Sequence, residues 1–454
     1  MEIFIVVVFI LGYLAITLEH SLKVDKLVPA LLMMALAWAG VAFGLDGFTS
    51  WFDSHAMKMI EGYGLMDHEA KLHLMESTLL HHFGKTCEIL IFLIGAMTIV
   101  EIIDHFHGFS TIKGFIKTNK KSTLLWIVCI LGFILSAIID NLTATIVLIT
   151  ILRKLVPNKT DRIWFAGLII IAANAGGAWS PIGDVTTTML WMNEKVSALM
   201  LIKYLILPSI VCMIIPTFIA SFLPAFKGNF EGSSDEGETD PKGAFMLYLG
   251  LAMIVFVPIF KTITHLPPYV GMMLSLSIVA MVAEIISSRR FSISSLGDEL
   301  DNKPEQHLVS PTFGALAKIE MPSILFFLGI LMTVAALESL GLIFTFGRDV
   351  QASIDGDLFV MLLGAGSAVI DNVPLVAASM GMFPSYQMDD LTWHFIAYAA
   401  GTGGSMLIIG SAAGVVAMGM EKISFFWYLK KIAWLALIGY LAGAGVFMLM
   451  RGFI

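Results

Sequence analysis

The chain has 454 residues, of which 57% are hydrophobic and 14% are charged, and its formal net charge is −8. Soluble domains carry about 25% charged residues, so this composition excludes a soluble globular protein and indicates an integral membrane protein built from helices. The negative charge argues against nucleic acid as a partner. The three cysteines lie in apolar runs without metal-ligand spacing, and we expect them to pack as core residues.

Apolar runs long enough to cross or nearly cross a bilayer recur along the whole chain. They cover residues 3–18, 27–45, 86–103, 163–192, 199–223, 245–264, 268–287, 322–340, 391–419 and 424–450. The first run follows Met1 and Glu2 without a basic region or a small-residue cleavage site, so it is predicted to be a retained span rather than a signal peptide. Two further apolar regions, 122–156 and 357–380, each carry an Asp-Asn pair in the middle.

Three polar segments separate these runs. Residues 46–85 are rich in histidine and are expected to form an ordinary exposed segment outside the cytoplasm, completing an N-terminal unit of two spans over 1–85. Residues 224–244 contain an acidic linker, and residues 288–321 form a second linker that begins with Arg289 and Arg290. Both linkers are predicted to be cytoplasmic, with two linking spans over 245–287 between them.

The sequence also repeats itself. Residues 89–98 resemble residues 324–333, the stretch Ser136–Thr143 resembles Ser367–Pro374, and the stretch Gly176–Asp184 resembles Gly403–Ser411. The three matches keep the same order and nearly the same spacing, which indicates a duplicated unit: repeat 1 over 86–223 with a hairpin at 122–156, and repeat 2 over 322–454 with a hairpin at 357–380.

Charges flanking the two Asp-Asn regions predict opposite orientations. Four lysines precede the first region and basic residues follow it, whereas acidic residues flank the second on both sides. By the positive-inside rule, the ends of the first region lie in the cytoplasm and those of the second lie outside. The two repeats are therefore inverted relative to each other, which is the architecture of many secondary transporters.

Both ends of each Asp-Asn region lie on the same side of the membrane, so each region is either a re-entrant hairpin or two full crossings. The run 357–370 would make about 21 Å of helix, short of the ~30 Å hydrocarbon core, so we predict hairpins with Asp-Asn at the tip. The glycine-rich stretches 176–183 and 401–404 would interrupt the crossings that follow. The predicted fold is an all-α polytopic membrane protein with two inverted-topology repeats, each containing a re-entrant hairpin and a discontinuous transmembrane helix.

Oxygen-bearing side chains gather at these interruptions. The candidate cation ligands are Asp140, Asn141, Thr143, Asn174, Asp184, Thr186, Thr187, Asp371, Asn372 and Ser405, with Ser411 beside them. Such ligands suit a hard cation better than zinc or copper. Burial raises the pKa of a carboxylic acid toward neutrality, where protonation and cation binding become alternative states of one site. Asp140, Asp371 and Asp184 are therefore the candidates for coupling cation movement to proton movement.

A structural explanation for the same acids remains open. Aspartate and asparagine are strong N-caps, so each Asp-Asn pair could cap a helix at a turn inside the membrane. Asp184 could cap the half-helix that follows it, as Ser411 could in the second repeat. Glu101 and Glu338, near the ends of related helices, could be interfacial.

At these residues the sequence resembles the NhaD-type sodium/proton antiporters of the larger ion transporter superfamily. The resemblance rests on the stretches Asp140–Thr143, Ala173–Thr188, Asp371–Pro374 and Gly401–Ser405. It implies exchange of Na⁺ or Li⁺ for protons without a cofactor, a scaffold domain with hairpin-bearing transport domains, and a homodimer in a bacterial inner membrane or a plastid envelope, the former being preferred here.

Two other functions compete with this one. The superfamily also contains arsenite and dicarboxylate carriers, but an acid before each asparagine would repel a carboxylate substrate. An intramembrane aspartyl protease would also use two membrane acids. Its usual Gly-x-Gly-Asp pattern is not met at Ser180–Asp184, and a protease gives no reason for an inverted duplication.

Overall fold

The computed structural model describes residues 1–452 apart from 54–57, 115, 117, 230–240 and 295–309. The described chain is almost entirely helical, with a short antiparallel pair of strands, β1 (Phe52–Asp53) and β2 (Lys58–Met59). Eight helices in this part of the chain are long and apolar enough to cross a membrane. The protein is therefore an all-α polytopic membrane protein, as the composition predicts.

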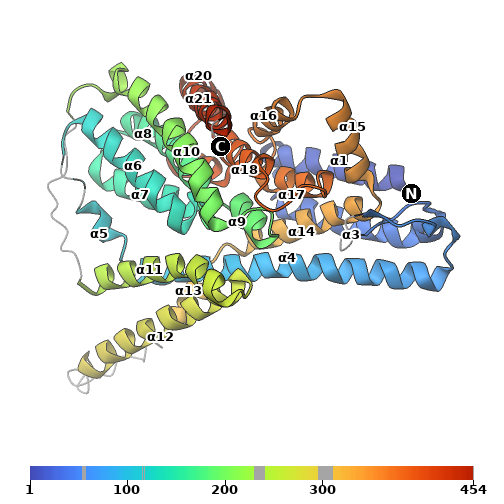
Figure 1. Cartoon of the computed structure of the whole chain (residues 1–454). Coiled ribbons are helices and arrows are strands. Elements are labelled where there is room, and N and C mark those ends of the chain that lie inside the picture. The colour runs from blue at the N-terminus through green and yellow to red at the C-terminus, as the bar shows by residue number, and fades with distance from the viewer. Residues whose placement is uncertain (54–57, 115, 117, 230–240, 295–309, 453–454) are drawn as a thin grey trace.

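Two outer helix pairs pack against the first long helices of the two repeats. Helices α1 (Glu2–Thr17) and α3 (Leu27–Gly44), joined by α2 (Glu19–Leu22), pack on α14 (Met321–Ser339). Helices α11 (Pro241–Thr264) and α12 (Pro268–Ser294) pack on α4 (His68–His105). The N-terminal pair thus lies against the first helix of repeat 2, and the middle pair against the first helix of repeat 1 (Figure 1).

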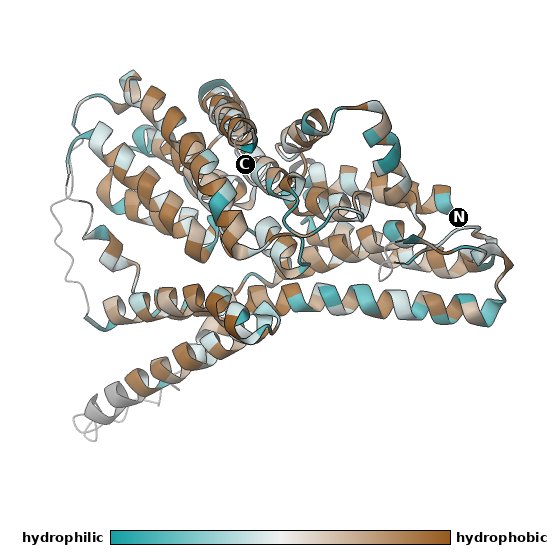
Figure 2. Cartoon of the chain, viewed as in Figure 1, coloured by the Kyte–Doolittle hydropathy of each residue, from teal (hydrophilic) through white to brown (hydrophobic). Residues whose placement is uncertain are grey.

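The second half of the histidine-rich segment is helical. Helix α4 begins at His68, where Asp67 caps it by accepting a hydrogen bond from the N–H of Ala70 at 3.0 Å, and it continues for 38 residues. At 1.5 Å per residue such a helix is about 57 Å long, far more than the ~30 Å core. Its N-terminal half is polar and mixed (Figure 2), so the second half of the segment 46–85 is a helical extension of the span.

Each repeat contains a hairpin, a discontinuous helix and a closing span. The hairpins are α6 (Lys121–Ile139) with α7 (Asn141–Leu155), and α16 (Gly356–Gly366) with α17 (Asn372–Met382). The discontinuous helices are α8 (Lys159–Gly177) with α9 (Val185–Met192), and α18 (Leu391–Gly403) with α19 (Ala412–Glu421). The closing spans are α10 (Ala198–Ser221), and α21 (Ala433–Arg451) preceded by α20 (Phe425–Lys431). The two hairpins open toward opposite ends of the molecule, with α6–α7 on the left and α16–α17 on the right of Figure 1.

Matching contacts hold the hairpin to the discontinuous helix in both repeats. The hydroxyl of Ser136 donates to the carbonyl of Ala173 at 2.5 Å, and that of Ser367 donates to the carbonyl of Ala400 at 3.1 Å. Gly176 and Gly403 abut the backbone of the neighbouring hairpin so closely that a Cβ on either would overlap it. Equivalent sequence positions thus make equivalent contacts, and the duplicated unit is a structural repeat.

The remaining elements connect these parts. They are η1 (Leu45–Gly47), η2 (Tyr63–Leu65), α5 (Ser110–Lys113), η3 (Pro224–Phe226), α13 (Pro311–Leu316) and α15 (Leu342–Ser353). Residues 230–240, the acidic centre of the predicted linker 224–244, and residues 295–309 of the linker 288–321 lie outside the described residues.

An ion triad around one buried carboxylate links the two repeats at the end predicted to be cytoplasmic. Glu421, 2% exposed at the end of α19, accepts from Arg153 Nε at 2.7 Å and from Arg162 Nε at 3.2 Å. The two arginines belong to α7 and α8, so one carboxylate joins three elements from both repeats.

We expect Glu421→Gln to lower the free energy of unfolding by about 2 kcal/mol, between the values for exposed and for buried pairs. The glutamine leaves two guanidinium groups without a counter-charge, so the melting temperature of the purified protein in detergent should fall. Asp357→Asn is the matched control, because it breaks an ion pair with Arg451 that is 2.5 Å long but more exposed. Equal losses for the two variants would contradict the importance of the triad.

Candidate functional site

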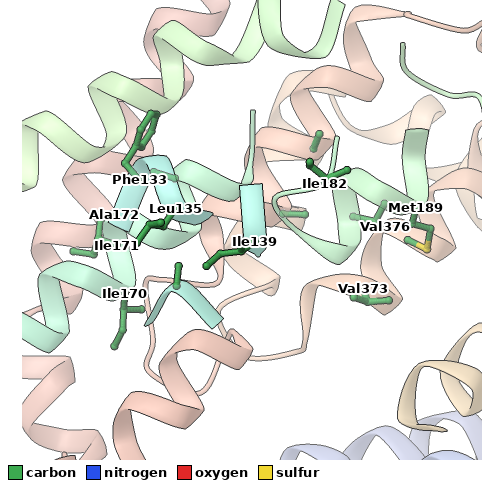
Figure 3. Packing of buried hydrophobic residues seen from close by; sticks show 14 of the residues in the cluster. Phe133, Leu135, Ile139, Ile170, Ile171, Ala172, Ile182, Met189, Val373 and Val376 are labelled. Atoms are coloured by element: carbon green, nitrogen blue, oxygen red, sulfur yellow. The ribbon is translucent and has the colours of Figure 1, made fainter. Parts of the chain in front are cut away.

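Both hairpin tips and the first helix break face one small cavity. Its volume is about 70 Å³, and its polar lining residues include Asp140 and Asn141 from hairpin 1, Asp371 and Asn372 from hairpin 2, and Asp184 from the break between α8 and α9. Apolar side chains of the same segments also line the cavity, among them Ile139, Ile182 and Val373, which are labelled in Figure 3. The fold therefore brings all three candidate acids to one site.

Each of the three acids caps the helix that follows it. Asp140 accepts from the N–H of Thr143 at 2.7 Å, Asp184 from that of Thr186 at 3.4 Å, and Asp371 from that of Val373 at 3.4 Å. The helix N-terminus satisfies part of each carboxylate and favours its negative charge. The capping role considered from the sequence is thus present at all three positions, and it fixes where the acids point.

Asp140 has an unusual backbone as well. Its φ is 84° and its ψ is 160°, a conformation that a residue with a side chain rarely adopts and that costs about 1–3 kcal/mol. Its second carboxylate oxygen accepts from the hydroxyl of Thr143 at 3.0 Å. The cap and this hydroxyl together hold the sharp reversal at the tip of hairpin 1.

Amide side chains join the two repeats at the site. Asn372 donates from Nδ2 to Oδ2 of Asp184 at 2.9 Å, which links hairpin 2 to the discontinuous helix of repeat 1. Asn141 donates to Oδ1 of Asn174 at 3.1 Å, and Asn174 in turn donates to the hydroxyl of Ser411 at 3.1 Å. Ser411 occupies in repeat 2 the place of Asp184, and it caps α19 by accepting from the N–H of Gly414. The site is therefore shared between the repeats, and at the equivalent helix breaks repeat 1 supplies the carboxylate of Asp184 and repeat 2 the hydroxyl of Ser411.

The predicted hydroxyl ligands are more scattered. Thr143 lies against Asp140, and Thr186 and Thr187 are buried in the first turn of α9 beside Asp184. The hydroxyl of Thr187 donates to the carbonyl of Asp184 at 2.9 Å. Ser405 donates to the carbonyl of Thr402 at 2.7 Å and is not among the residues that line the cavity.

The cavity also contains a residue that the sequence did not single out. Lys26, directly before α3, places Nζ 3.3 Å from Oδ2 of Asp371 and 4.4 Å from the ring centroid of Phe326. In the sequence Lys26 is one of several charges between two spans, and the 345 positions that separate it from Asp371 offer no sign of the pairing.

Three carboxylates and one ammonium group therefore share the cavity lining, which favours a cation over an anion as its occupant. Among the described residues, no group of three or more His, Cys, Asp or Glu side chains is arranged to hold a metal ion. Any cation bound here would need amide, hydroxyl or backbone oxygens in addition to the carboxylates.

Comparison with known proteins decides the family. The citrate transporter family model matches residues 6–396. Sodium/proton antiporter 1 of Arabidopsis thaliana is 40% identical over 98% of this chain and 72% of that protein. The Na(+)/H(+) antiporter NhaD of Halomonas elongata is 28% identical over 98% of this chain and 88% of that protein. The chain belongs to the NhaD-type antiporter family.

A solved structure agrees on the fold. The YdaH transporter of Alcanivorax borkumensis superposes with a TM-score of 0.54 at 12% identity, covering 93% of this chain and 98% of that one. The NhaD-type chain described here is thus a multi-pass transporter rather than an enzyme, and the protease alternative is excluded.

Two larger cavities flank the central one in this NhaD-type chain. One, of about 260 Å³, is lined by Glu101, Asp104 and Thr143, so it reaches the threonine that bonds Asp140. The other, of about 270 Å³, is lined by Glu338 and by Met189, the neighbour of a residue that lines the central cavity. Glu101 and Glu338 therefore line cavities on either side of the candidate site.

The second flanking cavity also contains His81, His82 and Lys195. Burial lowers the pKa of Lys195, a loop residue, while the nearby carboxylate of Glu338 acts in the opposite direction. Part of the histidine-rich segment thus lies beside charged groups in a cavity.

Proposed function

We propose that this protein exchanges Na⁺ or Li⁺ for protons across the membrane, with Asp140, Asp184 and Asp371 alternately binding cation and proton. The observation that carries this proposal is the placement of three carboxylates from both repeats around one cavity of about 70 Å³. Carboxylates in so small an apolar setting are costly unless a cation or a proton neutralises them. The names of the relatives, sodium/proton antiporters, support the same substrate pair.

The exchange follows from competition at these acids. A cation requires deprotonated carboxylates, so binding it releases protons and binding protons expels it. If each neutralised state permits the change of access between the two sides and the charged empty state does not, cation and proton move in opposite directions. The remaining ligands in the proposal are Asn141, Thr143, Asn174, Thr186, Thr187, Asn372 and Ser405, and no cofactor takes part.

The test is Na⁺-induced collapse of a pH gradient in everted vesicles. Asp140→Asn and Asp371→Asn should each impair it severely at unchanged protein level, and unimpaired exchange in both would refute the proposal. In the wild type, the half-saturating Na⁺ concentration should rise as the pH falls. If one Na⁺ displaces one proton, the rise is up to about tenfold for each pH unit, and each further proton displaced multiplies it by up to about ten again. A half-saturating concentration that does not depend on pH would show that cation and proton do not share the site.

A second candidate is an anion carrier, because the matching family model is that of a citrate transporter. The three acids at the cavity oppose a carboxylate substrate. Uptake of labelled citrate, a dicarboxylate or arsenite without any cation-induced pH change would favour this candidate.

The setting of the protein is part of the proposal. We place it in a bacterial inner membrane, which the bacterial NhaD relative supports and the plant relative does not. We also propose a homodimer, to be checked by the mass of the purified protein in detergent.

A further inference from the structure

Among the described residues, Asp371 is the one acid of the central cavity that has an ion-pair partner. Lys26 Nζ lies 3.3 Å from Oδ2 of Asp371, and the two side chains are 24% and 16% exposed. The other oxygen of Asp371 caps α17 at 3.4 Å. Asp140 and Asp184 accept hydrogen bonds from neutral groups instead.

The pairing breaks the symmetry of the two repeats. Helix α3 packs on α14, where Ala30 lies against Gly329, as α12 packs on α4, where Met272 lies against Gly95. The middle pair α11 and α12 contributes the apolar Ile254 and Met272 to the cavity lining, whereas the N-terminal pair contributes Lys26 from the connection before α3. Asp140 and Asp371 are equivalent in sequence, but a lysine neutralises one of them.

Lys26 also stands at a junction between cavities. It lines the central cavity together with Asp371, and both residues line a second cavity of about 80 Å³ that Tyr13 and Glu19 share. The lysine side chain is a flexible four-carbon stem with a compact charge at its end. It can therefore leave Asp371 for the second cavity, where Glu19 offers another carboxylate.

We propose that Lys26 is an internal cation that neutralises Asp371 in the empty site and that the transported cation must displace it. The inference rests on the proposed cation exchange. A transported cation at Asp371 would place two positive charges on one carboxylate in a poorly solvated cavity, which is unfavourable. The transported cation therefore has to break the Lys26–Asp371 ion pair when it binds. When that ion pair forms again, it favours release of the cation.

This role makes an unusual prediction for Lys26→Gln. Removing a residue that merely supports the site should weaken Na⁺ binding, whereas removing a competitor should strengthen it. We expect the half-saturating Na⁺ concentration of the purified full-length protein, measured by calorimetry in a K⁺ buffer, to fall roughly tenfold, the size of the coupling that contacting charges can show. Lys26→Arg keeps a positive charge on Asp371, so it should not show the fall in the half-saturating Na⁺ concentration expected of Lys26→Gln.

Lys23→Gln is the matched control, since Lys23 lies in the same connection and is exposed; its Na⁺ binding should be unchanged. Unchanged or weaker Na⁺ binding by a folded Lys26→Gln protein would overturn the proposal. Failure of the wild type to bind Na⁺ or Li⁺ at all would instead count against the proposed function, so the two failures are distinguishable.

A second measurement needs no variant. Amine acylation of the wild-type protein, read by mass spectrometry, should modify Lys26 several-fold faster in saturating Na⁺ than in K⁺, because Na⁺ frees the amine from Asp371. Lys23 in the same peptide region is the internal reference. A Lys26 labelling rate that does not respond to Na⁺ overturns the proposal even if the glutamine variant fails to fold.

Discussion

Asp184→Asn is expected to abolish cation-induced proton movement in everted vesicles while leaving the protein folded in the membrane. Asp184 is 3% exposed, and it is the acid that hairpin 2 contacts directly through Asn372, at 2.9 Å. Neutralising it removes both a cation ligand and a proton acceptor from the cavity. Exchange should fall to the level of vesicles that lack the protein.

The fold should survive because asparagine is as good an N-cap as aspartate. In Asp184 the two carboxylate oxygens accept from different donors, one from the N–H of Thr186 and the other from Asn372. The asparagine side chain has one oxygen in place of these two, so it can replace only one of the two hydrogen bonds. One hydrogen bond is therefore lost, worth about 1 kcal/mol. The melting temperature should drop by only a few degrees.

Asp355→Asn is the matched control. Asp355 also caps a helix, accepting from the N–H of Asp357 at 3.0 Å and of Leu358 at 3.2 Å, but it is exposed and lies away from the cavity. If Asp355→Asn exchanges normally and Asp184→Asn does not, the loss of exchange comes from the missing charge of Asp184 and not from a change in helix capping. Normal exchange in both would show that Asp184 is a structural cap alone.

The sequence was informative where residue types repeat. The Asp-Asn pairs and the glycine-rich stretches occur twice, so their matching identified the repeats, the hairpins and the helix breaks. Because a carboxylate is expensive inside a membrane, the same acids could be chosen as candidates without a structure. The limits of the hairpins, predicted at 122–156 and 357–380, lie within two residues of α6–α7 and α16–α17.

What the sequence missed depends on contacts between distant segments. Lys26 sits in a short polar connection, and its approach to Asp371 depends on how α3 packs against α14. The start of α4 was missed for another reason. Its first half is polar, so a hydrophobic pattern cannot separate a protruding helix from a loop, although Asp67 before His68 is a local capping signal.

Ser405 illustrates a second limit of the sequence. It follows the glycine pair of repeat 2 and is a proposed ligand, while in this structure its hydroxyl bonds the carbonyl of Thr402 and lies outside the cavity lining. A hydroxyl in a broken helix can satisfy the freed backbone as readily as it can face a substrate. The sequence alone cannot distinguish these two uses.

Gly176→Ala and Gly403→Ala are expected to prevent correct folding of the site. A Cβ at Gly176 would lie 2.7 Å from the Cα of Phe133 and closer still to its carbonyl, and one at Gly403 would lie 2.8 Å from the carbonyl carbon of Gly364. The obstacles are backbone atoms of the hairpins, so no side-chain rotation relieves them. Each hairpin would have to move away from its discontinuous helix, at the cost of more than the 1–3 kcal/mol typical of overpacking.

Both variants should therefore give little folded protein after detergent extraction, measured by size-exclusion chromatography, and the fraction that folds should have lost exchange. Gly84→Ala and Gly419→Ala are the controls, because both glycines are helical and a Cβ on either meets nothing within 4 Å. Alanine is the better helix former by about 1 kcal/mol, so these two should be as stable as the wild type or slightly more so. If Gly176→Ala and Gly403→Ala behaved like these controls, the close approach of hairpin and broken helix would not be what assembles the cavity. The equal severity expected in the two repeats follows from the duplication itself, since each glycine makes the same contact in its own copy.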